Sequence, residues 1–159
     1  MIIKSYAKIN LTLRVIKKLN NGLHDIQSNT CLISLFDKIN IRKTKKNKDV
    51  IIFDGKFSKH IKKSNNSVVK TLSMLRKLNI IQSRYKISIE KNIPVFSGLG
   101  GGTSNSAFII KYFLKKTDNK TLNFFEKQVG SDLRLFFQNQ SYQKSLKSLI
   151  KYRKKINLN

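Results

Sequence analysis

The sequence predicts an α+β domain, in which strands come first and helices alternate with one more strand afterwards. Apolar and polar residues alternate in several stretches of the first half, with the period of two that strands require. From residue 66 onward, apolar residues recur at helical intervals in three separate stretches. A chain of 159 residues has room for one domain, and a domain of that size buries roughly two-thirds of its unfolded surface.

The first strand is expected at residues 8–15, KINLTLRV. Its alternation puts Lys8 and Asn10 on one face and apolar side chains on the other, as in a strand with one buried side. The apolar face would consist of Ile9, Leu11, Leu13 and Val15. A turn is predicted at Asn20-Asn21-Gly22, because Asn and Gly adopt positive φ at low cost.

Three further stretches have the character of strands. Residues 30–43 predict one strand or a pair of strands, and residues 49–55 predict a short one. Alternation returns at residues 84–92, which lead through the only proline of the chain into a cluster of glycines.

Three stretches have the period of helices. A helix is expected within residues 65–79, capped by Asn66 or Ser67. Its buried side would consist of Val68, Leu72, Leu75 and Leu78. Two more helices are predicted at residues 103–116 and 120–129, and the glycine that follows would end the last one.

Composition narrows the class of protein. No apolar run approaches the roughly 20 residues that a membrane-spanning helix needs, and the first residues lack the pattern of a secretory signal. The single cysteine, Cys31, cannot form an internal disulfide, so a cytoplasmic location is expected. With only two histidines, His24 and His60, a zinc site of the Cys/His type is not expected.

The chain is strongly basic. Lys and Arg number 33 against 8 Asp and Glu, which gives a formal charge of +25 and favours polyanions such as nucleic acid or acidic lipid. The alternative is a bias of composition, because Lys, Asn and Ile are all abundant and the lysines are spread along the whole chain. We favour the second interpretation and expect no nucleic-acid partner, although both interpretations predict attraction to phosphates.

The glycine cluster is the clearest functional signal. Four of the seven glycines lie within residues 98–102, between a predicted strand and a predicted helix. Successive N–H groups can surround phosphate oxygens only where no Cβ intrudes, and a helix start adds unpaired donors and a positive dipole. The hydroxyls of Thr103 and Ser104 could bind the phosphates or a magnesium ion bound to them. The alternative is a tight packing turn in which glycine only permits positive φ, but such a turn does not need so many glycines. The loop is not a usual P-loop, because the lysine of that motif is absent.

A phosphate loop without a lysine of its own needs a cation and a proton acceptor from elsewhere. Lys8 is the candidate cation, and its alternative is a solvated lysine on a strand. Asp132 is the candidate acceptor, because it stands directly before an apolar segment where burial could tune it. Its alternative is an aspartate that caps a helix or a turn.

Four segments in this order resemble one family: YAKINLTLRV, NNGLHDIQS, IPVFSGLGGGTSNSA and VGSDLRLFF. The family is that of the 4-diphosphocytidyl-2-C-methyl-D-erythritol kinases, in the GHMP kinase superfamily, and the resemblance covers residues 4–140. It implies an N-terminal ATP-binding domain at residues 1–140, with two α/β layers and a left-handed βαβ crossover. It also implies transfer of the γ-phosphoryl group of ATP, with Mg²⁺, to a hydroxyl of diphosphocytidyl methylerythritol in non-mevalonate isoprenoid synthesis.

The resemblance also assigns roles to individual residues. Lys8 and Asp132 match the catalytic pair of the family, in which the aspartate acts on the proton of the acceptor hydroxyl. Asn10 and His24 match positions that contact the substrate, with His24 at the edge of the cytosine. The ATP-binding loop would consist of Pro94, Gly98, Leu99, Gly100, Gly101, Gly102, Thr103 and Ser104.

The chain departs from the family in several places. Phe96 stands where the family has glycine, Leu23 where it has an aromatic residue that stacks on cytosine, and Arg134 where it has proline. Family members continue into a second domain, whereas residues 141–159 here predict a basic helical tail. The helical spacing of Leu146, Leu149 and Ile150 indicates this helix, and its other face is rich in lysine.

Two alternatives to a kinase therefore stay open at this point. One is a truncated, non-catalytic remnant of the family that still binds nucleotide, and the other is a basic protein that binds polyanions. A second copy of the chain, or a separate chain, could complete a kinase site.

Overall fold

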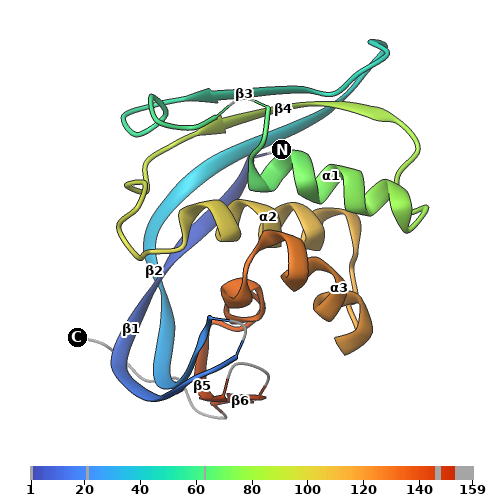
Figure 1. Cartoon of the computed structure of the whole chain (residues 1–159). Coiled ribbons are helices and arrows are strands. Elements are labelled where there is room, and N and C mark those ends of the chain that lie inside the picture. The colour runs from blue at the N-terminus through green and yellow to red at the C-terminus, as the bar shows by residue number, and fades with distance from the viewer. Residues whose placement is uncertain (1, 21, 63, 146–147, 153–159) are drawn as a thin grey trace.

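The structure is a computed structural model that describes residues 2–20, 22–62, 64–145 and 148–152 (Figure 1). Its strands are β1 (Ile2–Lys18), β2 (His24–Thr44), β3 (Val50–Asp54), β4 (Arg84–Glu90), β5 (Gln140–Ser145) and β6 (Ser148–Lys151). Its helices are α1 (Ser67–Lys77), α2 (Gly101–Phe113) and α3 (Asn119–Val129), followed by the 3₁₀ helix η1 (Ser131–Phe137).

Strand β2 is the central strand of the sheet and pairs with three other strands. β1 lies antiparallel to it along one edge, from the Lys18↔His24 pair to the Ile2↔Asn40 pair. The other edge of β2 pairs with β4 at residues 38–44 and with β5 at residues 28–31. β3 adds to the sheet parallel to β4, and α1 lies in the connection between these two strands. The stretch at residues 30–43 is therefore part of one long strand, not of a pair.

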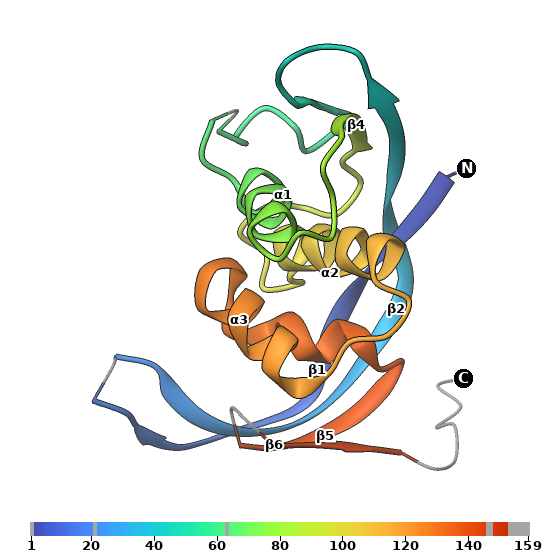
Figure 2. The same cartoon turned by 90° about the vertical axis from the view of Figure 1, so that its right-hand side faces the viewer.

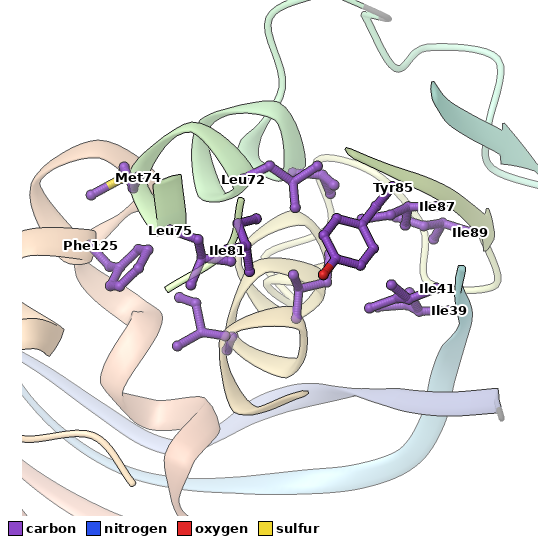
Figure 3. Packing of buried hydrophobic residues seen from close by; sticks show 14 of the residues in the cluster. Ile39, Ile41, Leu72, Met74, Leu75, Ile81, Tyr85, Ile87, Ile89 and Phe125 are labelled. Carbon is purple, nitrogen blue, oxygen red and sulfur yellow. The ribbon is translucent and has the colours of Figure 1, made fainter. Parts of the chain in front are cut away.

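The helices form a second layer on one side of the curved sheet (Figures 1 and 2). The main core fills the space between the layers. Figure 3 shows the sheet isoleucines close to Tyr85 at one end of the cluster, and Phe125 of α3 with Met74 and Leu75 of α1 at the other end. Its members include Ile39, Ile41, Ile87 and Ile89 from the sheet, and Leu72, Leu75, Ile109, Ile110 and Phe125 from the helices. The predicted α+β domain is confirmed.

Most of the predicted helices are present, with shifted ends. Asn66 caps α1 as predicted, and its side-chain oxygen accepts two backbone N–H groups at 3.0 Å. Leu78 lies after the last residue of α1 and is exposed, so its predicted place on the buried side was wrong. α2 begins at Gly101, two residues earlier than predicted, and Gly130 ends α3 as predicted. No helix in the described part of the chain combines the length and apolar character needed to cross a bilayer.

The alternation predicted for the first strand holds only at its start. Lys8 and Asn10 share a face, as predicted. The register with β2 shifts just after Asn10, and the extra residue moves Leu13 and Val15 to the face of Lys8 and Asn10. These two apolar side chains are 61% and 57% exposed, because this end of the β1–β2 ribbon extends beyond the helices (Figure 2). The prediction of a half-buried strand was wrong beyond Asn10.

The predicted helical tail was also wrong over the part that the structure describes. Residues 140–145 form β5 and residues 148–151 form β6, with Leu149 opposite Gln143. β5 pairs with residues 28–31 of β2, which satisfies backbone groups that would otherwise lie open at that edge. Leu146 and residues 153–159 lie outside the described residues.

Candidate functional site

A cavity of about 730 Å³ lies at the N-terminal end of α2. Its lining includes Gly98, Gly100, Gly101, Gly102, Thr103 and Asp132. Gly100 is the N-cap of α2 and no side chain caps this helix, so its first-turn N–H groups have no side-chain acceptor. Unpaired amides and the positive end of the helix dipole together make a site for an anion such as phosphate.

Two features of the structure require glycine in this loop. Gly98 and Gly100 have φ values of 76° and 71°, in the left-handed region that favours glycine. A Cβ at Gly100 would also lie 2.7 Å from Cζ of Phe136 and 3.6 Å from Cγ of Lys8. The backbone N–H of Lys8 donates to the carbonyl of Leu99 at 3.1 Å. The loop is therefore packed against both β1 and η1 at Gly100.

Replacing Gly100 by Ala is expected to destabilise the domain by more than about 1 kcal/mol, because backbone strain adds to a clash with the Phe136 ring. The urea midpoint of unfolding measures this loss. Gly22→Ala is the matched control, since Gly22 has a φ of 82° and no heavy atom within 4 Å of a Cβ. Equal losses in the two variants would show that the contact with Phe136 contributes nothing.

Lys8 and Asp132 come from opposite ends of the chain and meet beside this cavity. Nζ of Lys8 lies 3.2 Å from Oδ2 of Asp132. The ammonium also donates to Oδ1 of Asn10 at 2.5 Å, and the amide of Asn10 donates to Oγ of Ser28 at 2.7 Å. Lys8 is buried, whereas the side chain of Asp132 is 34% exposed and lines the cavity. A carboxylate with an adjacent buried ammonium can take up a proton from a group bound in the cavity.

The short helix η1 holds Asp132 in place through several contacts. Its apolar residues Leu133 and Phe136 are buried, and Nζ of Lys111 on α2 donates to the carbonyl of Phe136 at 2.5 Å. Arg134 pairs with Glu126 of α3 at 2.6 Å and donates to side chains on the same helix. The arginine at this position therefore ties η1 to α3.

His24 lies away from this cluster. It is exposed at the start of β2, six residues along the strand from Thr30, the partner of Asn10. Six residues of strand span roughly 20 Å. The regular alternation of β2 nevertheless places His24, Ser28 and Thr30 on the face that carries Asn10. The structure thus brings together Lys8, Asn10 and Asp132 but not His24.

The predicted loop residues separate into two groups. The first group lines the cavity and consists of Pro94, Gly98, Gly100, Gly101, Gly102 and Thr103. Leu99 forms the second group with Ser104, and its carbonyl accepts the backbone N–H of Lys8 on β1. Ser104 is fully buried, and its hydroxyl lies 2.6 Å from the carbonyl of Tyr6 and 2.8 Å from Oγ of Ser5. The hydroxyl of Ser104 is therefore committed to holding α2 against β1, and the prediction that it meets the ligand is not supported.

A buried ion pair lies next to the loop, and no pattern in the sequence predicted it. Lys91 follows β4, and its ammonium pairs with Oδ2 of Asp37 on β2. Asn105 of α2 accepts from Lys91 at 3.0 Å and donates to Asp37 at 2.9 Å. The other oxygen of Asp37 accepts the backbone N–H groups of residues 92 and 93, each at 2.8 Å. One network thus joins the sheet, the segment that enters the loop and the helix that leaves it.

This network brings the ammonium group of Lys91 close to the candidate phosphate site. A Cβ at Gly101 would lie 3.4 Å from Nζ of Lys91, and both residues line the cavity. Burial lowers the pKa of Lys91, and the adjacent carboxylate of Asp37 opposes that shift. Nothing in the local pattern around Lys91 separates it from the many other lysines, so only the fold identifies it.

The cavity offers oxygen ligands suited to a hard cation. Among the residues that the structure describes, no three His, Cys, Asp or Glu side chains gather as a metal cluster. Thr103 and Asp132 both line the cavity and supply a hydroxyl and a carboxylate. Mg²⁺ is usually bound by one or two carboxylates together with phosphate oxygens, so these residues fit a magnesium ion that accompanies a phosphate ligand.

Comparison with known proteins identifies relatives that share the sequence pattern. Residues 66–128 match the family model described as the GHMP kinases N terminal domain. The 4-diphosphocytidyl-2-C-methyl-D-erythritol kinase of Pelagibacter ubique is 37% identical over 139 residues, which are 82% of this chain and 48% of that protein. The kinase of the same name from Ureaplasma parvum is 37% identical over 140 residues, 86% of this chain and 52% of that protein. The chain spans about half the length of the curated relatives it matches.

Solved structures share the fold over a similar portion. A crystal structure of a 4-(cytidine 5'-diphospho)-2C-methyl-D-erythritol kinase superposes with a TM-score of 0.65 at 22% identity, covering 89% of this chain and 51% of the other. A homoserine kinase from Cytophaga hutchinsonii gives a TM-score of 0.64 at 18% identity, covering 94% and 50%. At these identities the likeness establishes the fold alone.

Proposed function

We propose that this chain, which carries a GHMP kinase N-terminal domain homologous to about half of the 4-diphosphocytidyl-2-C-methyl-D-erythritol kinases, provides the phosphoryl-transfer site of such a kinase. In this proposal the γ-phosphoryl group of ATP passes to a hydroxyl of diphosphocytidyl methylerythritol, in the cytoplasm. One observation carries it: the carboxylate of Asp132 lies 3.2 Å from the buried ammonium of Lys8, at the edge of a cavity lined by helix-start amides.

The proposed roles follow from where each residue lies. The amides of the glycine loop bind the triphosphate, and the Lys8 ammonium offsets part of its charge. Asp132 accepts the proton of the acceptor hydroxyl while that oxygen forms its bond to the γ-phosphorus and the bond to ADP breaks. Asn10 fixes the direction of the Lys8 ammonium. These contributions are mostly positioning and charge neutralisation, as phosphoryl transfer requires.

Two further roles complete the proposal. The hydroxyl of Thr103 would contact the Mg²⁺ that accompanies the phosphates, and this ion would neutralise part of their charge when it is bound. His24 would contact the distant cytosine end of the substrate, from the face of the ribbon that also carries Asn10. A long substrate could contact both positions, which lie on one strand pair.

Turnover with defined acceptors tests this function. The purified chain is mixed with Mg-ATP and diphosphocytidyl methylerythritol, and both ADP and the phosphorylated product are followed. We expect ADP to form only when that acceptor is present, and homoserine serves as a control acceptor because a homoserine kinase shares the fold. Absence of the phosphorylated product at any protein concentration would refute the proposal for the chain by itself.

A second candidate function is nucleotide binding without turnover. The observation that favours it is the exposed apolar pair Leu13 and Val15, which lies on the face of Lys8. A second copy or a separate chain could cover this face and complete the acceptor site. Calorimetric titration with Mg-ATP distinguishes the two functions, because this candidate predicts binding without ADP formation.

A further inference from the structure

Phe96 has an unusual conformation at the mouth of the candidate site. Its φ is +61°, in the left-handed region, and it lies between Pro94 and Gly98 in the segment that leads into α2. Among the described residues, the other non-glycine residue with positive φ is Asn79, which follows α1. Asparagine adopts this region readily, whereas for a bulky residue it is a true outlier that costs folding free energy. Such outliers cluster at functional sites.

The ring of Phe96 buries too little surface within the domain to offset this cost in folding free energy. Its side chain is 94% exposed, the highest value among the exposed large apolar residues of the described chain. Pro94 and Val95 before it are partly buried, whereas Ser97 and Gly98 after it are exposed. The ring therefore does not pack in the core. A contact with a bound molecule would explain why a phenyl ring stands at this position.

The cavity itself suggests what the ring contacts. One part of the lining consists of the helix-start amides and Asp132, which suit phosphates. Another part is apolar and includes Phe53, Ile61, Val95 and Phe96. A ligand whose triphosphate binds the amides has a flat base at its other end. An aromatic ring at the rim provides a face on which such a base stacks.

We infer that Phe96 is a stacking residue for the base of the donor nucleotide, an inference that rests on the proposed ATP site. Stacking on a phenyl ring depends on the π face that every base has, so Phe96 adds affinity without selecting among bases. ATP and GTP should lose affinity to a similar extent when the ring is removed. Inorganic triphosphate, which has no base, should bind as before.

Calorimetric titrations of wild type, Phe96→Leu and Phe96→Gly with Mg-ATP and with magnesium triphosphate test this. Loss of the ring is expected to weaken Mg-ATP by roughly 5- to 100-fold and triphosphate by less than about 2-fold. Phe96→Gly relieves the backbone strain, so its urea midpoint should be no lower than that of the wild type. That measurement excludes unfolding as the cause of weaker binding.

Phe96→Trp provides a second readout, because the chain has no tryptophan of its own. This variant keeps an aromatic face, so it should retain Mg-ATP affinity and its fluorescence should change with Mg-ATP but not with triphosphate. Unchanged Mg-ATP affinity in Phe96→Leu would overturn the stacking role and leave the proposed ATP site standing. Failure of the wild type to bind either ligand would overturn both, so the two failures are distinguishable.

Discussion

Replacing Asp132 by Asn is expected to lower the rate of phosphoryl transfer by about 10²- to 10⁴-fold, because the amide cannot accept the proton of the acceptor hydroxyl. The substitution preserves size and shape, and the side chain is 34% exposed. Mg-ATP affinity should therefore change much less than the rate. Single-turnover ADP formation and calorimetric titration of the same preparation measure the two quantities.

Asp54→Asn is the matched control for this loss. Asp54 is an exposed aspartate at the end of β3 that does not line the cavity, so the same chemical change there should leave the rate unaffected. Turnover by Asp132→Asn within a few-fold of the control would show that another group takes the proton. The Lys8–Asp132 pair would then be a structural contact, and the proposed reaction would lose its base.

Replacing Lys91 by Met is expected to destabilise the domain by roughly 3–5 kcal/mol, the usual loss when one partner of a buried ion pair is removed. Asp37 is fully buried and would keep its charge without the ammonium that offsets it. The contact of Lys91 with Asn105 would also be lost, so the start of α2 should loosen and Mg-ATP should bind more weakly. Unfolding in urea and calorimetric titration measure the two effects.

The adjacent surface pair offers a close control. Lys38 follows Asp37 and Glu90 precedes Lys91, and these two pair at 3.0 Å while remaining 45% and 42% exposed. Lys38→Met should cost less than about 1 kcal/mol, because exposed pairs contribute little. The double variant Lys91→Met/Asp37→Asn should recover part of the stability, since no unpaired charge remains. Equal urea midpoints for Lys91→Met and Lys38→Met would contradict the role given to the buried pair.

The sequence was informative wherever a local rule decided the structure. The period of two placed Lys8 and Asn10 on one face, because no extra residue interrupts β1 between them. The glycines at residues 98–102 predicted a bare backbone with unpaired donors at a helix start, and the structure has α2 beginning at Gly101 without a side-chain cap, beside a cavity. The approach of Asp132 to Lys8 depended on the family resemblance, since no local pattern relates residues so far apart in sequence.

The wrong predictions concern features that contacts between distant parts of the chain decide. Leu13 and Val15 changed faces because a bulge in β1 adds one residue, and a bulge leaves no clear mark in an alternating pattern. The tail formed strands because the open edge of β2 at residues 28–31 accepts β5. Lys91 was not recognised because burial, and not residue type, distinguishes it from the other lysines.

The hydrogen bond from the Lys8 amide to the carbonyl of Leu99 has a mechanical consequence. Lys8, whose ammonium has a role in the proposed reaction, thus also tethers the loop that is proposed to bind the phosphates. A substitution that displaces the backbone of β1 at Lys8 is therefore expected to displace the glycine loop as well. A displacement of the loop at Leu99 should in turn reach Lys8.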